Sequence, residues 1–199
     1  MAGVPAALAA LWTPPGLALG LLGLPAAIAL FFRDPDRVVP TAPQLVVAPA
    51  DGRVIHAGAA RAGEAPPGDW RQVTIFLSLL DVHINRSPVG GVVTRIDYVP
   101  GSFLPAYRHD AFRNEHSEIW FDVHGATVVA RQVVGVLARR VVCRLAVGQA
   151  VERGARIGLM KFGSRMDVFV PVTASVEVAA GARVRAGETI VARLPGGAA

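Results

Sequence analysis

The 199-residue sequence contains one cysteine, Cys143, and one lysine, Lys161. A single cysteine excludes an intramolecular disulfide and a multi-cysteine zinc site. The histidines have no spacing suited to a shared metal, so we expect no metal site. The net charge is +5, but the basic residues are scattered, apart from Arg139-Arg140, and no aromatic residues alternate with them. We therefore expect no nucleic-acid partner.

Charged side chains are absent before Arg33, and residues 1–32 are dominated by apolar types. This length is enough to cross a hydrocarbon core of roughly 30 Å, although Pro14-Pro15 should kink or break a helix. We predict a membrane anchor at residues 1–32, either one kinked helix or a helical hairpin. A secretory signal peptide is disfavoured because no positive side chain precedes the apolar run. Arg33 and Arg37 flank that run, so we place residues 33–199 on the cytoplasmic side of the cell membrane.

Residues 33–199 have a β-like pattern, in which short segments rich in Val, Ile and Thr alternate with Gly and Pro turns. The predicted strands lie at residues 45–48, 73–80, 92–99, 118–123, 127–136 and 141–147. Since no long segment has a helical stripe, we predict a mainly β catalytic domain, with one short helical turn at residues 79–82. Arg165 and Asp167 alternate along a further strand, where we expect them on its polar face.

An internal repeat of the form G-x-x-V-x-x-G-x-x-I occurs at residues 148–157 and again at 181–190. Glycines at such spacing can supply positive-φ turns. Two such units resemble the halves of a biotinyl or lipoyl barrel-sandwich, with Lys161 between them as the residue that would carry the cofactor. A carrier of biotin or lipoate is therefore one candidate function, and a membrane-anchored adaptor that uses the sandwich as a structural module is another.

The dipeptide Gly163-Ser164 suggests a different chemistry. A serine hydroxyl in a tight turn can attack the carbonyl of a preceding glycine, which has no side chain to hinder it, and convert the peptide bond into an ester. Loss of the serine α-proton then expels the ester oxygen, and hydrolysis of the resulting dehydroalanine gives a pyruvoyl group. That ketone can form a Schiff base with an amine and accept electrons from a decarboxylation.

Further motifs place this dipeptide in a family context. They are Phe31-Phe32-Arg33-Asp34-Pro35, Pro49-Ala50-Asp51-Gly52, the segment 81–88, Tyr98-Val99-Pro100-Gly101, Asn114-Glu115 and Phe162-Gly163-Ser164. In this order they resemble the phosphatidylserine decarboxylase family, in its short form with a Phe-Gly-Ser cleavage site. That form includes archaetidylserine decarboxylase-like proteins, so ester-linked and ether-linked lipid substrates both remain open.

The resemblance implies that the proenzyme cleaves itself between Gly163 and Ser164. Residues 1–163 would form a β chain and residues 164–199 an α chain, and the two would stay together as a heterodimer. Ser164 would become a covalent pyruvoyl group, with no metal or dissociable cofactor. That group would form a Schiff base with phosphatidylserine in the membrane and yield phosphatidylethanolamine and carbon dioxide. A homodimer of these heterodimers is a further expectation of the resemblance.

The resemblance also implies roles for other residues. His83 matches the first histidine of the family's Asp-x-His-x-x-His pattern and would transfer the proton in decarboxylation. Arg86 replaces the second histidine, so the base that triggers cleavage is left open, and Arg86 itself could bind a carboxylate or phosphate. Asp51 would orient His83 or assist cleavage. Asn114 and Glu115 would approach the substrate from a polar loop.

These observations favour the decarboxylase over the carrier and the adaptor. A carrier domain requires only about 80 residues and would leave Asp51 and His83 without a role. Carriers also have a second methionine directly after the lysine, where this sequence has Phe162. The repeat alone supports all three functions equally, because a fold does not assign a function.

Overall fold

The structure, a computed structural model, describes residues 23, 25–136, 141–160 and 164–196. The chain divides into two units, residues 1–35 and 36–199. In the first unit, residues 25–31 are helical. Across the described ranges no helix is long and apolar enough to span a membrane. The anchor predicted for residues 1–32 falls mostly outside the described residues and stays a prediction.

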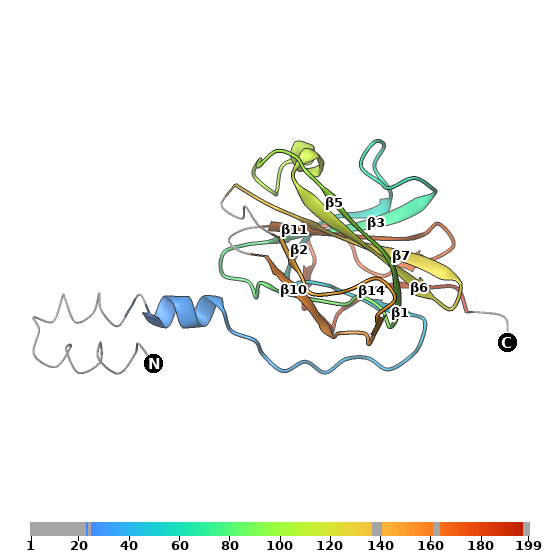
Figure 1. Ribbon diagram of the computed structural model, residues 1–199, viewed down its shortest axis with the longest axis horizontal. Helices are drawn as coiled ribbons and strands as arrows, with labels where there is room; N and C mark the ends of the chain where they lie inside the picture. Colours follow the sequence, from blue (N-terminus) through green and yellow to red (C-terminus); the bar gives the residue numbers. More distant parts are fainter. Residues whose placement is uncertain (1–22, 24, 137–140, 161–163, 197–199) are drawn as a thin grey trace, which may run out of the picture. The chain divides into compact units, whose positions relative to one another are not determined.

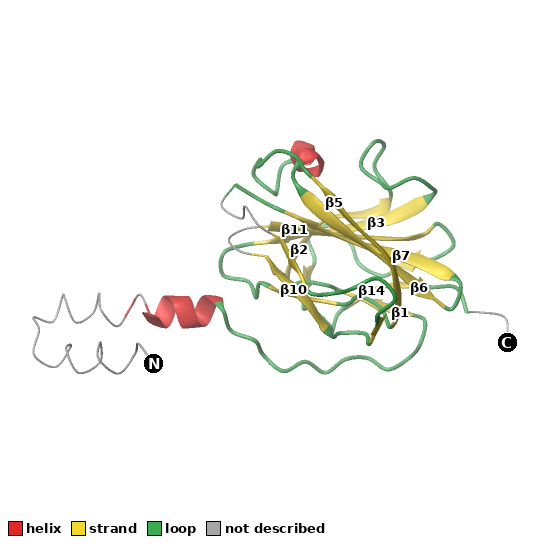
Figure 2. Cartoon of the chain, in the orientation of Figure 1, coloured by secondary structure: helices red, strands yellow, loops and turns green. Residues whose placement is uncertain are grey.

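Strands are the main regular structure among the described residues of the second unit, which confirms the predicted mainly β class (Figure 2). The strands are β1 (Leu45–Val47), β2 (Gly52–Ala59), β3 (Trp70–Leu77), β4 (Ile84–Arg86), β5 (Gly91–Val99), β6 (His116–Val123), β7 (Ala126–Val133), β8 (Val141–Cys143), β9 (Ala150–Val151), β10 (Arg156–Met160), β11 (Ser164–Pro171), β12 (Ser175–Val176), β13 (Arg183–Val184) and β14 (Ile190–Arg193). The helical turn predicted at residues 79–82 is wrong, because that segment forms a tight turn without helix. A 3-10 helix, η1 (His109–Arg113), lies instead in the predicted polar loop.

Eight of these strands form one antiparallel sheet in the order β13-β2-β3-β11-β7-β6-β5-β9. Two three-stranded sheets, β1-β14-β12 and β4-β10-β8, complete the unit. Figure 1 shows β1, β14 and β10 on one side of the long strands β3, β11 and β7. The buried core contains side chains from the large sheet, such as Ile75 and Val168, together with Val191 and Ile157 from the small ones. The small sheets therefore cover one face of the large sheet.

The internal repeat has a structural counterpart. Gly148, Gly154, Gly181 and Gly187 have φ angles of 85°, 76°, 94° and 78°, a region that side-chain-bearing residues disfavour. The two copies end the large sheet at its opposite edges, because β9 pairs with β5 and β13 pairs with β2. The repeat thus supplies matching edge strands and turns.

Candidate active site

Ser164 is the first residue of β11, in the middle of the large sheet. It lies opposite Leu77 of β3, and the next residues of β11 also pair with β7. Side chains alternate along a strand, so Ser164 shares the core-facing side with Met166. The Ser164 side chain is fully buried, and its Oγ has no hydrogen-bond partner among the described residues. A buried hydroxyl without a partner is unfavourable and is expected where function requires it.

His83 lies directly before β4 and is 1% exposed. Its carbonyl accepts a hydrogen bond from the Met160 amide at 3.2 Å, which aligns His83 with the last residue of β10. Only residues 161–163 separate Met160 from Ser164, so His83 and Ser164 belong to the same end of the sheet arrangement. The ring Nδ1–H donates to the Asp81 carbonyl at 2.8 Å. This bond makes Nε2 the acceptor nitrogen of the neutral ring.

Asn85 and Gln132 form a buried amide pair that sequence reasoning missed. Gln132 Nε2 donates to Asn85 Oδ1 at 2.8 Å, and both side chains have no exposed surface. Asn85 Nδ2 and Gln132 Oε1 have no hydrogen-bond partner in the part of the chain that the structure describes. The signal in the sequence was an amide inside the segment of residues 128–134, which otherwise contains four valines, one alanine and Arg131.

Asp51 directly precedes β2, and both of its carboxylate oxygens are engaged. Oδ2 accepts from Arg37 at 2.9 Å, and Oδ1 accepts from the Ala186 amide at 2.7 Å. Arg37 also lies 3.7 Å from Glu188. These contacts tie the start of β2 to the turn that follows β13.

Arg86 lies on β4 three residues after His83, so alternation places the two side chains on opposite faces of that strand. Arg86 Nη1 donates to the Gly154 carbonyl at 3.1 Å. A Cβ on Gly187 would lie 3.2 Å from Arg86 Cδ. The guanidinium therefore packs where the two copies of the repeat meet, on the face of β4 opposite His83.

Asn114 and Glu115 connect η1 to β6. The Asn114 side chain is fully buried: its Nδ2 donates to the carbonyls of Leu104 and Val134 at 2.7 and 2.9 Å, while Oδ1 accepts from the Leu104 amide at 2.8 Å. These bonds fix the loop before η1 against the end of β7. Glu115 is half-buried, and its side-chain hydrogen bond raises the pKa of Tyr98.

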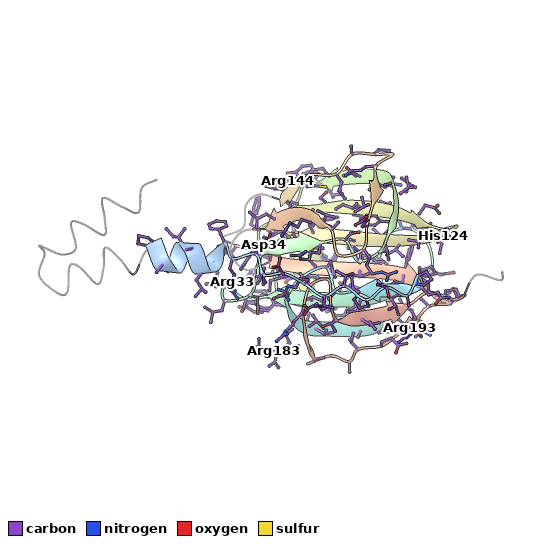
Figure 3. The ribbon with its side chains drawn as sticks, turned by 90° about the horizontal axis from the view of Figure 1, so that it is seen from below. Arg33, Asp34, His124, Arg144, Arg183 and Arg193 are labelled. Carbon is purple, nitrogen blue, oxygen red and sulfur yellow. The ribbon has the colours of Figure 1, made fainter. Side chains whose placement is uncertain are left out.

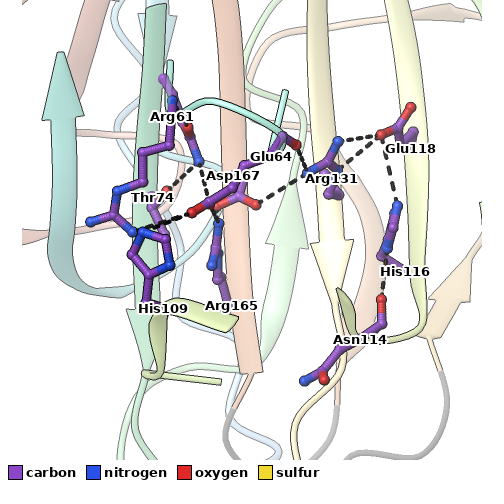
Figure 4. Close-up of polar contacts among 11 residues, drawn as sticks. Arg61, Glu64, Thr74, His109, Asn114, His116, Glu118, Arg131, Arg165 and Asp167 are labelled. Carbon is purple, nitrogen blue, oxygen red and sulfur yellow. Dashed lines mark hydrogen bonds and ion pairs between the residues drawn. The ribbon is translucent and has the colours of Figure 1, made fainter. Parts of the chain in front are cut away.

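The outer face of the large sheet contains a charge cluster in which Arg165 and Asp167 lie on the polar face of β11, as predicted, but are fully buried (Figure 4). Arg165 donates to Asp167 Oδ1 through Nε and to Glu64 Oε2 through Nη2, both at 2.7 Å. Arg131 bonds Glu118 and the Glu64 carbonyl. Glu64 belongs to the loop between β2 and β3, which covers this face.

Electrostatics hold the central pair of this cluster ionised. Burial opposes ionisation of Asp167, but the charge and hydrogen bond of Arg165 outweigh it and lower the pKa of Asp167. The same carboxylate, together with Glu64, raises the pKa of Arg165 against the effect of burial. Burial lowers the pKa of His116, although its bond to the Asn114 carbonyl at 2.7 Å partly opposes this. The cluster therefore fixes β11 directly after Ser164.

Known proteins have sequences similar to that of this chain. The profile of the Phosphatidylserine decarboxylase family matches residues 24–192. A phosphatidylserine decarboxylase proenzyme of Symbiobacterium thermophilum is 45% identical over 177 residues, which cover 88% of this chain and 82% of that protein. The chain belongs to the phosphatidylserine decarboxylase family. Proteins of the same name from Geobacter sulfurreducens and Salinibacter ruber are each 43% identical, over 84% and 93% of this chain and 78% and 83% of their own lengths.

Membership in the phosphatidylserine decarboxylase family confirms the predicted resemblance. The match runs from before β1 into β14 and includes Ser164 and His83. It favours the decarboxylase over the carrier and adaptor alternatives, which needed only the repeat. Lys161, the residue that a carrier would modify, lies outside the described residues, as does Gly163.

Proposed function

We propose that this protein is a self-processing enzyme that converts phosphatidylserine to phosphatidylethanolamine and carbon dioxide. Its family membership supports this proposal, as do the proenzyme names of its relatives. The observation that carries it is Ser164, a fully buried serine with an unpartnered hydroxyl at the start of the central strand β11. Cleavage before Ser164 would turn this residue into a pyruvoyl group.

Residue 164 suits such a group. Its side chain faces the core beside Leu77 and Met166, whose apolar surfaces exclude water. A pyruvoyl group supplies a ketone that condenses with the substrate amine and accepts the electrons that decarboxylation releases. The chain supplies the strands that hold it, since β11 is hydrogen-bonded to β3 on one side and β7 on the other.

His83 is the proposed proton donor. Its Nδ1–H is held by the Asp81 carbonyl, and a protonated Nε2 can deliver a proton to the carbon from which carbon dioxide leaves. The contacts of Asp51 and Asn114 favour positioning roles, because their polar atoms are occupied by the chain itself. We propose that Asp51 fixes the start of β2, and that Asn114 fixes the loop from which Glu115 approaches the substrate.

The α chain would stay bound after cleavage. Residues 164–199 contribute β11, which pairs along its length with β3 and in part with β7. They also contribute β14, which pairs with β1, and β13, which pairs with β2. Removing one peptide bond leaves all of these ladders intact, which supports a stable heterodimer of residues 1–163 and 164–199.

Surface features support a substrate held in a membrane. Leu79 and Leu80 are 51% and 79% exposed in the turn between Leu77, opposite Ser164, and His83. Arg183, 76% exposed and 3.8 Å from Asp81, adds positive charge next to that turn (Figure 3). Exposed leucines beside a basic side chain favour contact with the surface of an anionic bilayer. We propose that residues 1–32 anchor the enzyme and that its catalytic domain faces the cytoplasm.

A denaturing mass measurement of the purified protein tests the central claim. We expect two fragments divided between residues 163 and 164, the smaller with a blocked amino terminus. Ser164→Ala should give one uncut, inactive chain, whereas His83→Ala should be cut but decarboxylate poorly. An intact wild-type chain with a free serine in an active preparation would refute the proposal. An intact chain with an added acyl group on Lys161 would support a carrier instead.

A further inference from the structure

The family pattern leaves the activation of Ser164 unexplained in this chain, because Arg86 replaces the second histidine and packs on the far face of β4. The large sheet offers another polar group near residue 164. Gln132 of β7 lies opposite Met166 of β11 in the register of the two strands. Ser164 is therefore the diagonal neighbour of Gln132 on the same face, and diagonal neighbours are separated by about 7–8 Å, with their Cβ atoms somewhat closer, which a glutamine side chain can span.

The Gln132 amide is held in one orientation. Its Nε2 donates to Asn85 Oδ1 at 2.8 Å, and the same nitrogen packs over Gly158 of β10, where it would lie 2.8 Å from a Cβ. An amide group is planar, so fixing the nitrogen toward Asn85 turns Oε1 away from Asn85. That Oε1 is buried and, within the described ranges, has no donor.

Ser164 presents the complementary group. Its Oγ is buried without a partner, and rotation about the Cα–Cβ bond can turn it among three staggered positions. An unpartnered acceptor and an unpartnered hydroxyl on neighbouring strands of one buried face each carry a cost that a mutual hydrogen bond removes. We propose that Gln132 Oε1 accepts a hydrogen bond from the Ser164 hydroxyl in the reactive state, and that Asn85 is the positioning residue that aims Gln132.

This inference rests on the proposed function and concerns its first step. In that step Ser164 Oγ forms a bond to the carbonyl carbon of residue 163, and the peptide C–N bond breaks. The hydroxyl proton ends on the amino group of residue 164, so the product is an ester and an amine. A neutral amide is too weak a base to remove the proton. The hydrogen bond instead fixes the hydroxyl rotamer and directs an oxygen lone pair at the carbonyl.

The link also ties Ser164 to His83. Residues 83 and 85 share one face of their segment, and Asn85 joins that face to Gln132 of the large sheet. The amide pair therefore connects the strand that carries the proposed proton donor with the strand beside the cleaved serine.

The rate of self-cleavage in freshly translated full-length protein, supplied with membranes and followed on denaturing gels, tests the inference. We expect Gln132→Met and Asn85→Leu to slow cleavage about 10- to 100-fold. Asn85→Asp keeps an oxygen that accepts from Gln132 Nε2, and should cleave at close to the wild-type rate. Gln72→Leu is the matched control. It removes another fully buried amide, whose Nε2 donates to Thr74 at 3.0 Å on the outer face, and should not slow cleavage.

Two further measurements separate positioning from misfolding. Thermal unfolding of each variant, as uncut chain, shows whether it folds, and Asn85→Leu can carry the test if Gln132→Met does not fold. Hydroxylamine cleaves esters, so a variant blocked before the ester forms should stay uncut in its presence. Cleavage of folded Gln132→Met and Asn85→Leu at the wild-type rate, or equal slowing by Gln72→Leu, would overturn the inference. Failure of the wild type to cleave at Ser164 would instead overturn the proposed function.

Discussion

The buried pair of Arg165 and Asp167 makes a strong prediction about stability. Asp167→Asn keeps the size of the side chain but removes the charge that Arg165 contacts at 2.7 Å. Removing one partner of a buried ion pair costs about 3–5 kcal/mol, because the other charge stays buried without compensation. Arg165 retains its contact with Glu64 at 2.7 Å, so we expect the lower part of that range, about 3–4 kcal/mol.

Such a loss is a large fraction of the 5–15 kcal/mol that typically holds a domain together. With a urea m-value of about 2 kcal/mol/M, the unfolding midpoint should fall by about 1.5–2 M. The loss of unfolding free energy in Asp167→Asn should not change with pH above the ordinary aspartate pKa of 3.8. Because the folded pKa of Asp167 is lowered, the stabilisation by its charge is present above that value and disappears as the pH falls through the lower folded pKa.

Urea unfolding in a Ser164→Ala background, where the chain stays in one piece, provides the assay. The fluorescence of Trp70 and Trp120 reports on unfolding, since their rings lie 6.0 Å apart on strands of the large sheet. The control is Asp110→Asn, which breaks an exposed ion pair and should leave the midpoint unchanged. If Asp167→Asn unfolds at the urea concentration of its parent, the reasoning that this pair holds β11 is wrong.

Three other predictions follow from the structure. Gly158→Ala should destabilise the uncut chain by about 2–3 kcal/mol in urea unfolding, because the added Cβ would overlap a carbonyl oxygen of β8. Gly90→Ala is the control and should not change stability, because a Cβ there would lie 3.5 Å or more from its neighbours. Replacing both Leu79 and Leu80 with Ser should raise the KM for phosphatidylserine in vesicles severalfold but leave turnover of a water-soluble short-chain analogue unchanged; equal effects on both substrates would contradict a membrane-contact role. Burial lowers the pKa of folded His116 below 6.5, so the unfolded chain binds the proton more readily and the wild type loses unfolding free energy between pH 7 and pH 5. His116→Gln should reduce this loss. An unchanged pH dependence of the unfolding free energy would count against this.

Several features of the fold could be predicted from short stretches of the sequence. Alternating β-branched residues indicated strands, and the glycines at 148, 154, 181 and 187 indicated turns, because positive φ is a property of a single residue. The strand ends were less accurate. The segment predicted at 73–80 became β3, which ends at Leu77, because Ser78 and Asp81 close a turn through hydrogen bonds of 2.6–2.8 Å.

The candidate site was predictable only in part. Ser164 and His83 could be selected because each lies in a short sequence motif that resembles a motif of a known family. Asp51 and Asn114 were selected in the same way, yet their polar atoms bind neighbouring parts of the chain. A motif indicates which residue types are present, but not whether a carboxylate or amide is already satisfied by the backbone around it.

The sequence by itself determined the mainly β class, the repeat with its turns and the presence of the Gly163-Ser164 dipeptide, since each depends on neighbouring residues or on a two-residue period. Tertiary structure decided which faces are covered. Arg165 and Asp167 alternate as an exposed pair would, but the loop that carries Glu64 closes over them and makes them a buried cluster. Gln132 likewise meets Asn85 only because a second sheet packs on the first. Alternation assigns side chains to the two faces of a strand, whereas burial depends on segments distant in the chain that come to lie against them.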